Sequence, residues 1–566
     1  MQPELVRGAL RAAWHMGAIE WREGTLPSTL ARMRERRGLA FARDWSFAEL
    51  LEHAARSHGQ KPFLEYDHDA HSFCAMNARA NRVARRLRAV GIGEGTGVAL
   101  MLSNHPRFLD AFFALNKLGA YAVPVNVGLV GTGLAHVLGH SEVRAVVCDH
   151  ETAARVATLR TPRIEHIWVN DAEAPEGWIA PEGTRRFSEL ERGTVADADD
   201  LGYQASPDTP ALLLYTSGTT GPAKAVVTAH GESRVKAAGL LANLLYQRDD
   251  KLFSCLPLFH ANALLVAVLP ALWKGIPLHL TKRFRASTFW REVAECGATQ
   301  LNTIGGMIPI LLKTPPSPFD RAHRVRRIIS AACPKEAWQR FEARFGVKLW
   351  EAYGAVDGGG VAIFNAGDGP IGSIGRLPKT TRWRLVGDDG NDVVRGRAGE
   401  LWVEVREERA VRYWRDEKAT REKVVDGWLH TGDLMTADED GHLHFVGRNT
   451  DSVRRRGENV SAWEVEQVVG SHPDVLECAA FGVPSPVGEQ DIMVSVVPVE
   501  GRSFDPASLV SLMREKLPKY AVPAFLDVVA ELPKTPTHRV IKGELARRGV
   551  TEATIRIEER RGRADA

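Results

Sequence analysis

The stretch from Ala211 to Lys224, which reads A-L-L-L-Y-T-S-G-T-T-G-P-A-K, constrains the fold and the chemistry of this chain most strongly. Its apolar beginning predicts a buried strand that ends at Tyr215. Two glycines and a proline follow closely, so the next residues fit neither a strand nor a regular helix. They predict a loop rich in backbone N–H groups and hydroxyls that suits a polyphosphate. A Walker A loop is excluded because the lysine lies between two alanines.

Length and charge bound the classes of protein that remain. With 566 residues, the chain is too long for one core, so we expect two or more domains. The net charge of +3, from 73 basic and 70 acidic residues, indicates no nucleic-acid partner. The six cysteines are widely spaced and form no C-x-x-C motif, which favours a reducing, cytoplasmic compartment and argues against structural zinc.

The sequence predicts no segment that spans a membrane. The N-terminus lacks the apolar core of a signal peptide, and the longest apolar run, Ala263 to Trp273, is too short to cross a bilayer. Residues 1 to about 45 mix arginines with Leu, Trp and Met. This segment is interpreted as a solvated helix packed on the body, with an amphipathic interfacial helix as the alternative. Weak peripheral association with a membrane therefore stays open.

Alternating strand and helix patterns predict a parallel α/β sheet in the first part of the chain. Helical spacing covers residues 77–90 and 108–118, and strands are expected at 97–102, 120–125 and 143–148. The glycine-rich run at 91–97 precedes a strand, so it predicts a turn rather than a dinucleotide site. A smaller unit follows Ser471, with strands at 478–483 and 492–497 and a helix at 506–517.

Several ordered motifs resemble those of the adenylate-forming enzymes, the superfamily of acyl-CoA synthetases, luciferases and peptide-synthetase adenylation domains. The phosphate loop of that family matches residues 215–221. The other matching motifs are Y-G-A-V-D at 353–357, G-W-L-H-T-G-D at 427–433, G-R at 447–448 and P-K-T at 533–535. The resemblance spans about residues 45–550. It implies an α/β fold with a large N-terminal domain of mixed and parallel sheets and flanking helices, and a small mobile α+β C-terminal domain.

The resemblance also implies the residues that bind ATP. Lys224 and the loop hold the phosphates, Asp433 binds both ribose hydroxyls, and Arg448 also reaches the ribose. The turn that contains Ala332 packs against the adenine, and Tyr353 stacks on it. The implied ATP- and AMP-binding residues are Thr216, Ser217, Gly218, Thr219, Thr220, Gly221, Ala332, Tyr353, Gly354, Asp433 and Arg448.

Four positions depart from the family pattern. Val356 replaces a threonine, and Asp357 replaces the glutamate that holds Mg²⁺, although its carboxylate still suits that ion. Thr450 occupies the hinge position, usually Asp or Lys. Arg539 stands where the family has its catalytic lysine, and guanidinium keeps the charge but not the geometry.

Two further assignments concern the acid and CoA. His260, in F-S-C-L-P-L-F-H, corresponds to a family histidine near the acyl pocket, and we count it with Lys224 and Arg539 as catalytic. The run of arginines at 454–456 is a solvated charge run or a phosphate site for CoA. On the second interpretation, the CoA-binding residues are Arg456, Gly457 and Glu458.

The motifs together predict an AMP-forming acid–CoA ligase that uses ATP, Mg²⁺ and CoA. The domains are expected at 1–448, which binds AMP and the acid, and at 449–566, which is mobile. The acid is predicted to be a long-chain fatty acid because residues 315–326 resemble fatty-acid-transport-protein-type synthetases, and also the carnitine–CoA ligases. Bile-acid-like, aryl and carnitine-like acids are the alternatives. Adenylation for a carrier protein and non-catalytic binding are the alternative functions.

Overall fold

The computed structural model describes residues 45–557, except for 160, 194–198, 217–222, 233–234, 380, 388, 406–410, 449–451, 456–457, 486–489, 518–520 and 535–539. None of the helices in these ranges is both long and apolar enough to cross a membrane.

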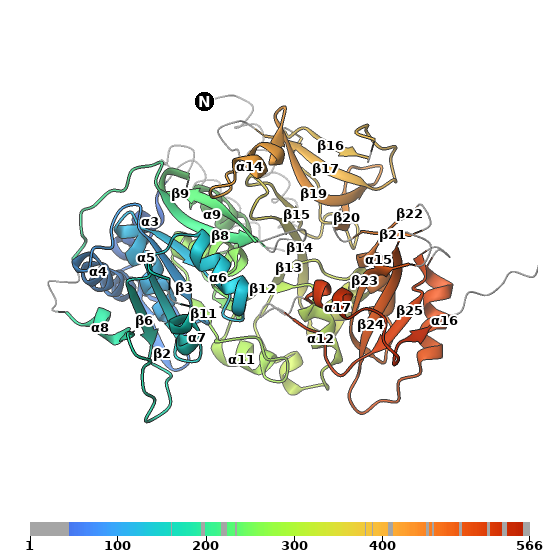
Figure 1. The fold of residues 1–566 in the computed structure, drawn as a ribbon, viewed down its shortest axis with the longest axis horizontal. Helices are drawn as coiled ribbons and strands as arrows, with labels where there is room; N and C mark the ends of the chain where they lie inside the picture. The colour runs from blue at the N-terminus through green and yellow to red at the C-terminus, as the bar shows by residue number, and fades with distance from the viewer. Residues whose placement is uncertain are drawn as a thin grey trace, which may run out of the picture.

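The first large sheet has β8 and β9, the strands that flank the predicted phosphate loop, at one edge (Figure 1). Its strands run in the order β7-β6-β5-β3-β4-β8-β9 and are parallel, except that β8 and β9 are antiparallel. The strand bounds are β3 Gly97–Met101, β4 Tyr121–Pro124, β5 Ala145–Asp149, β6 His166–Asn170, β7 Arg185–Arg186, β8 Pro210–Thr216 and β9 Lys224–Ala229. The helices of this region are α3 Phe47–His58, α4 Phe73–Ala89, α5 Pro106–Lys117, α6 Gly131–His140, α7 Ala153–Thr158 and α8 Ser188–Glu191.

The second large sheet has the order β15-β14-β13-β12-β10-β11-β1-β2, with antiparallel pairs at its two edges and parallel pairs between them. Its strands are β1 Pro62–Tyr66, β2 Asp69–Ser72, β10 Leu252–Ser254, β11 Leu278–Leu280, β12 Gln300–Ile304, β13 Arg327–Ala331, β14 Lys348–Gly354 and β15 Ala362–Asn365. Its helices are η2 His230–Glu232, α9 Val235–Leu245, the π-helix η3 Asn262–Val268, α10 Leu269–Lys274, α11 Phe289–Cys296, α12 Met307–Lys313, η4 Pro318–Asp320 and α13 Lys335–Phe345.

One hydrophobic core joins these sheets, and α5 lies at its centre. Residues of β3, β8, β12 and β13 belong to the same buried cluster. All 12 residues of α5 are buried, including the polar residues Arg107, Asp110, Asn116 and Lys117. The buried charge of Asp110 on this helix is compensated by Arg79, whose Nη2 lies 2.6 Å from a carboxylate oxygen of Asp110. Unpaired, this carboxylate would carry a heavy desolvation cost.

A smaller antiparallel sheet supplies the ribose motif. Its strands run in the order β16-β17-β19-β18, and β20 pairs with the other part of β19. The bounds are β16 Trp383–Val386, β17 Gly399–Glu404, β18 Val424–Val425, β19 Trp428–Ala437 and β20 Leu443–Arg448, with helix α14 Glu417–Lys423 before β18.

The C-terminal unit has its own cores, built from residues between Val453 and Ile557. Its elements are β21 Ser452–Arg455, β22 Glu458–Ser461, α15 Ala462–Gly470, β23 Val475–Pro484, β24 Gln490–Pro498, α16 Pro506–Lys516, β25 Phe525–Val528, α17 Lys542–Arg548 and β26 Ile555–Arg556. Lys313 on α12 reaches this unit and donates to the carbonyl of Leu476 at 3.1 Å.

The predicted α/β architecture, with a large N-terminal part and a small C-terminal unit, is confirmed. The predicted helices correspond to α4, α5 and α16, and the glycine-rich run at 91–97 is a turn that leads into β3. Strand β20 ends at Arg448 and β21 begins at Ser452. The proposed boundary after residue 448 therefore falls beside residues 449–451, outside the described part, and stays a prediction.

Candidate active site

The two ends of the predicted phosphate loop are held by strand pairing. Thr216, at the end of β8, pairs in register with Lys224, at the start of β9. The Thr216 hydroxyl also donates to the Lys224 carbonyl at 3.2 Å. The loop residues Ser217, Gly218, Thr219, Thr220 and Gly221 lie outside the described residues. The hairpin therefore places the loop at the carboxyl end of β8.

Helix α6 braces both stems of this loop. Nδ1 of His140 lies 2.9 Å from the Tyr215 hydroxyl, just before the loop. Nε2 of His136 donates to the carbonyl of Ala223, just after the loop, at 3.0 Å. Burial lowers the pKa of His140 below its ordinary value, and the neighbouring His136 adds to this effect. Two side chains one helical turn apart thus position both ends of the loop.

The turn assigned to adenine is a strained segment held by a buried carboxylate. Ala332 has φ +66°, a left-handed conformation that is unfavourable for any residue with a Cβ. Glu351 on β14 accepts hydrogen bonds from the backbone N–H groups of Ala332 and Cys333, the latter at 3.2 Å. Burial raises the pKa of Glu351 to about 8, although these N–H groups favour ionisation. Gly305 leaves room for the turn, since a Cβ there would lie 1.9 Å from the Ala332 carbonyl oxygen.

The residues assigned to adenine and ribose meet at one carboxylate. The Tyr353 hydroxyl donates to Oδ2 of Asp433 at 2.6 Å, and Nε of Arg448 lies 3.2 Å from Oδ1. The side chain of Asp433 is only 4% exposed. Burial raises its pKa, and Arg448 opposes that rise. Gly354 ends β14 immediately after Tyr353. A carboxylate with two accepting oxygens is suited to two ribose hydroxyls.

Asp357, the predicted metal ligand, lies in a second polar cluster. Its Oδ2 accepts from the Tyr413 hydroxyl at 2.7 Å and pairs with Nζ of Lys423 at 2.9 Å. Burial opposes ionisation, but Lys423 and Tyr413 outweigh it and lower the pKa of Asp357. No group of three or more His, Cys, Asp or Glu among the described residues is arranged to hold a metal. One ionised carboxylate still fits Mg²⁺, which takes most of its remaining ligands from phosphates and water.

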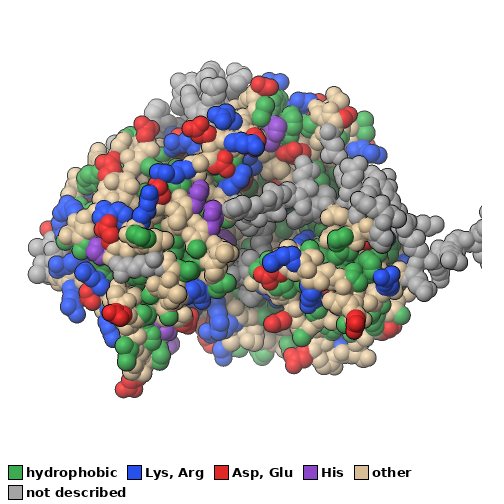
Figure 2. All heavy atoms as spheres, in the orientation of Figure 1, with side chains coloured by type: hydrophobic (Ala, Val, Ile, Leu, Met, Phe, Trp, Pro, Cys, Tyr) green, Lys and Arg blue, Asp and Glu red, His purple; other side chains and the backbone are tan. Residues whose placement is uncertain are grey.

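Helix α14 and the residues before it connect these clusters to Lys224. Nζ of Lys224 lies 3.6 Å from Oδ2 of Asp416, the N-cap of α14, and 5.6 Å from the centre of the Tyr413 ring. The Trp414 backbone N–H donates to the carbonyl of Ala225 at 2.8 Å, which fastens this segment to β9. Figure 2 shows Lys and Arg side chains gathered on this face of the molecule, over α14 and β9. The arrangement provides cations beside two carboxylates, as nucleotide binding requires.

Comparison with known proteins agrees with this geometry. Residues 51–407 match the family model described as AMP-binding enzyme, and residues 464–539 match the AMP-binding enzyme C-terminal domain. The chain belongs to the AMP-binding enzyme family.

Two relatives and one solved structure illustrate the likeness. The sulfoacetate–CoA ligase of Cupriavidus necator H16 is 33% identical, and the alignment covers 88% of this chain and 96% of the relative. The crotonobetaine/carnitine–CoA ligase of Salmonella paratyphi A is 30% identical, with 84% and 92% covered. The crystal structure of the anthranilate CoA ligase AuaEII with anthranoyl-AMP has a TM-score of 0.78 and 24% identity, and the match covers 89% and 97% of the chains. The predicted family of AMP-forming acyl-CoA ligases, which use ATP, Mg²⁺ and CoA, is confirmed.

Several site predictions for this AMP-binding enzyme stay open. Thr450, Arg456, Gly457 and Arg539 lie outside the described residues, as does most of the phosphate loop. Glu458 begins β22, and nothing is described of its side chain. His260 is half-buried before η3, with its ring 4.8 Å from that of Phe259. These residues keep their predicted roles only as proposals.

Sequence reasoning missed several residues of the enzyme's site. Glu351 is a carboxylate among apolar residues of a strand, and a charged residue in such a strand is a usable signal of a functional or structural role. Tyr413, in Y-W-R at 413–415, received no role. Lys423 lay in the charged run E-K-A-T-R-E-K, which is typical of a solvated helix. His136 and His140 left no signal, because only folding brings α6 to the loop.

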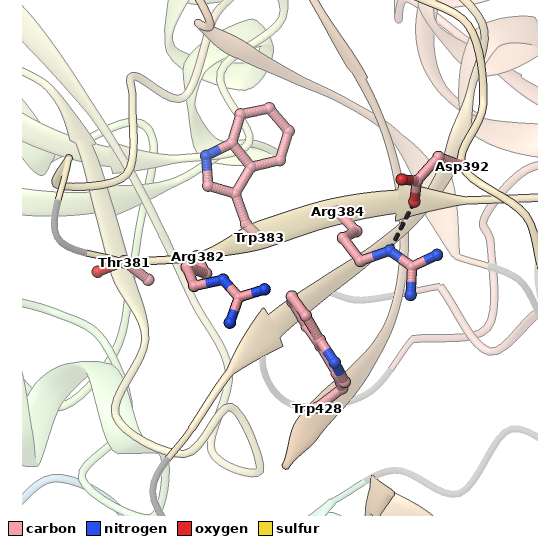
Figure 3. Close-up of a pocket in the computed structure, with 6 residues that line it drawn as sticks. All are labelled: Thr381, Arg382, Trp383, Arg384, Asp392 and Trp428. Atoms are coloured by element: carbon pink, nitrogen blue, oxygen red, sulfur yellow. Dashed lines mark hydrogen bonds and ion pairs between the residues drawn. The ribbon is translucent and has the colours of Figure 1, made fainter. Parts of the chain in front are cut away.

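A shallow pocket of about 630 Å³ lies apart from this site, on the sheet that contains β16 and β19 (Figure 3). Its residues are Thr381, Arg382, Trp383, Arg384, Asp392 and Trp428. Arg384 pairs with Asp392 at 2.6 Å and lies over the Trp428 ring at 5.6 Å. Trp428 is half-buried at the start of β19, whereas Asp433 is buried further along the same strand. None of the residues that line this pocket is assigned to the nucleotide.

Proposed function

We propose that this protein joins a carboxylic acid to CoA in two steps, through an acyl-adenylate, with AMP and pyrophosphate as the other products. The observation that best supports this proposal is that Tyr353 and Arg448 both contact the buried carboxylate of Asp433. These residues come from separate motifs of the family and meet beside Asp357. The arrangement suits a nucleotide whose ribose is held by Asp433 and whose phosphates are bound through Mg²⁺ at Asp357.

The first step brings two anions together. A carboxylate oxygen forms a bond to the α-phosphorus of ATP, the bond from that phosphorus to the bridging oxygen breaks, and pyrophosphate leaves. Lys224 and Arg539 are proposed to neutralise the developing charge, while Asp433 orients the ribose. Mg²⁺ held by Asp357 and the phosphates would supply further positive charge. His260 is proposed to lie beside the acid.

The second step transfers the acyl group. The CoA sulfur, after losing its proton, forms a bond to the acyl carbon, and the bond to AMP breaks. We propose that residues 449–566 turn about Thr450 between the steps, separately from residues 1–448, and that Arg456, Gly457 and Glu458 meet CoA. All six cysteines are free, which supports a cytoplasmic site of action.

For the acid, we propose a small polar molecule of the carnitine-like kind rather than a long-chain fatty acid. The two relatives named above act, by their names, on sulfoacetate and on crotonobetaine or carnitine. The long-chain prediction rested on residues 315–326, and the structural contacts of that segment explain its composition differently. The Asp320 carboxylate pairs with Arg344 at 2.8 Å, and the His323 ring stacks on Trp290 at 4.5 Å. These two contacts pack the segment against α13 and α11.

The test is ATP-dependent release of pyrophosphate with sulfoacetate, carnitine, benzoate, a bile acid and palmitate, each with and without CoA. We expect release with a small polar acid, and acyl-CoA only when CoA is present. If palmitate were the only one of these acids to be turned over, the long-chain prediction would be restored. Release that CoA does not turn into a thioester would favour a carrier protein as the acceptor. No release with any acid would favour non-catalytic binding.

A further inference from the structure

Lys423 is a buried cation inside the candidate site. Its side chain is only 12% exposed, although it ends a helix whose other residues are largely charged. On the same helix, Lys418 is 83% exposed and Arg421 is 75% exposed, and both pair with glutamates of α14. Lys423 instead turns inward, where Nζ lies 2.9 Å from Oδ2 of Asp357. Burying an ammonium costs free energy unless specific partners compensate it.

The position of this ammonium relates it to both nucleotide-binding carboxylates. Besides Asp357, it donates to the carbonyl of Thr431 at 3.4 Å, two residues before Asp433. Burial raises the pKa of Asp433, and Arg448 and, to a smaller extent, Lys423 oppose that rise. Lys423 therefore contacts Asp357, the carboxylate assigned to Mg²⁺, and the backbone two residues before Asp433, the carboxylate assigned to the ribose. In a nucleotide, the α-phosphate is the group between ribose and the outer phosphates.

We propose that Lys423 binds the α-phosphate of the bound nucleotide, and this inference rests on the proposed function. An ammonium has three N–H donors. Asp357 and Thr431 accept two of them among the described residues, which leaves one for a phosphate oxygen. Lys423 thereby adds a fixed positive charge at the phosphorus that the acid attacks. This role would offset the loss at Val356, where the family resemblance implies a threonine hydroxyl that contacts the α-phosphate.

A purely structural role predicts a different outcome. If Lys423 only neutralised Asp357, the Tyr413 hydroxyl would still hold that carboxylate at 2.7 Å, and removing both charges together would restore nucleotide binding. If Lys423 binds the phosphate, its loss weakens binding even when Asp357 carries no charge. The two roles are therefore separable by combining substitutions at these positions.

The first experiment compares AMP with adenosine by titration calorimetry, in EDTA so that no metal contributes. We expect Lys423→Met to weaken AMP binding by about tenfold or more and to change adenosine binding by less than about twofold, because adenosine has no phosphate. Lys423→Arg, which keeps the charge, should recover most of the AMP affinity. The matched control is Lys418→Met on the exposed side of the same helix, which should bind both ligands as the parent does.

The second experiment repeats the comparison in the Asp357→Asn background. We expect Lys423→Met still to cost about tenfold in AMP affinity there. Equal AMP affinity of Asp357→Asn and the double variant would overturn the proposal, as would parent-like AMP binding in Lys423→Met alone. Thermal unfolding of each variant shows whether the fold is retained, and the adenosine affinity reports an intact site. Failure of the proposed function is distinct, because the parent would then release no pyrophosphate with any acid.

Discussion

The most informative perturbation of the nucleotide site is Asp433→Asn, because it removes one charge and almost no volume. In the parent, Asp433 is 4% exposed and has Tyr353 and Arg448 as partners. A hydrogen bond to a charged group contributes about 1.5–3 kcal/mol, and one between neutral groups about 0.5–1.5 kcal/mol. Replacing the carboxylate should therefore cost about 1–1.5 kcal/mol for each ribose hydroxyl. For two hydroxyls, ATP should bind about 30- to 150-fold more weakly.

Deoxynucleotides test whether that loss arises at the ribose. We expect the parent to discriminate against 2′-deoxy-ATP and 3′-deoxy-ATP by about 1.5–3 kcal/mol each, and Asp433→Asn by about 0.5–1.5 kcal/mol, measured by calorimetry. Asp440→Asn, at an exposed position in the turn between β19 and β20, is the matched control and should bind ATP as the parent does. If Asp433→Asn discriminated against both deoxynucleotides as strongly as the parent, Asp433 would not be the ribose ligand.

Three further predictions follow from the same site. Lys224→Ala should slow pyrophosphate release by about 10²-fold, the effect of losing one preorganised charge; unchanged release would remove Lys224 from the phosphate site. Arg539→Ala should lose adenylation but still convert a presynthesised acyl-adenylate and CoA to thioester; adenylation at the parent's rate would show that Arg539 is not the catalytic cation. The pKa of Glu351 is raised to about 8, so the folded state binds this proton more tightly than the unfolded state does. The free energy of unfolding should therefore fall by up to about 1.4 kcal/mol per pH unit as the pH rises from about 4.5 to 8. Glu351→Gln should lose this pH dependence in denaturant unfolding, and an unchanged slope would contradict the assignment.

Much of the fold followed from short-range patterns. The helical spacing at 77–90 corresponds to α4, Phe73–Ala89, and the apolar run before the phosphate loop corresponds to β8, Pro210–Thr216. Such patterns depend on neighbouring residues, and their periods are the periods of the elements themselves. The boundaries differ by a few residues, because hydrogen bonding and capping decide where an element ends. Ser72, for example, caps α4 by accepting from the Ala75 N–H at 3.1 Å.

The site was less predictable from the motifs alone. The motif T-G-D singled out Asp433, but nothing local indicated that the Tyr353 hydroxyl, 80 positions earlier, would occupy its Oδ2. Residues 315–326 were interpreted as a sign of a long-chain acid, and in the structure Asp320 and His323 of this segment contact α13 and α11. A resemblance between short segments carries composition, and it does not say which side chains line a pocket.

The sequence by itself indicated the main elements, their order and the residues proposed to carry nucleotide chemistry, because ordered motifs and hydrophobic periods are properties of the chain. Only the tertiary structure decided which of these residues act together. Lys423 and Lys418 are chemically identical and five positions apart, yet one is buried against Asp357 and the other faces solvent. Glu351 has its pKa raised to about 8 only because folding removes it from water. Burial and the distances between remote residues decide both outcomes, and neither is defined until the chain has folded.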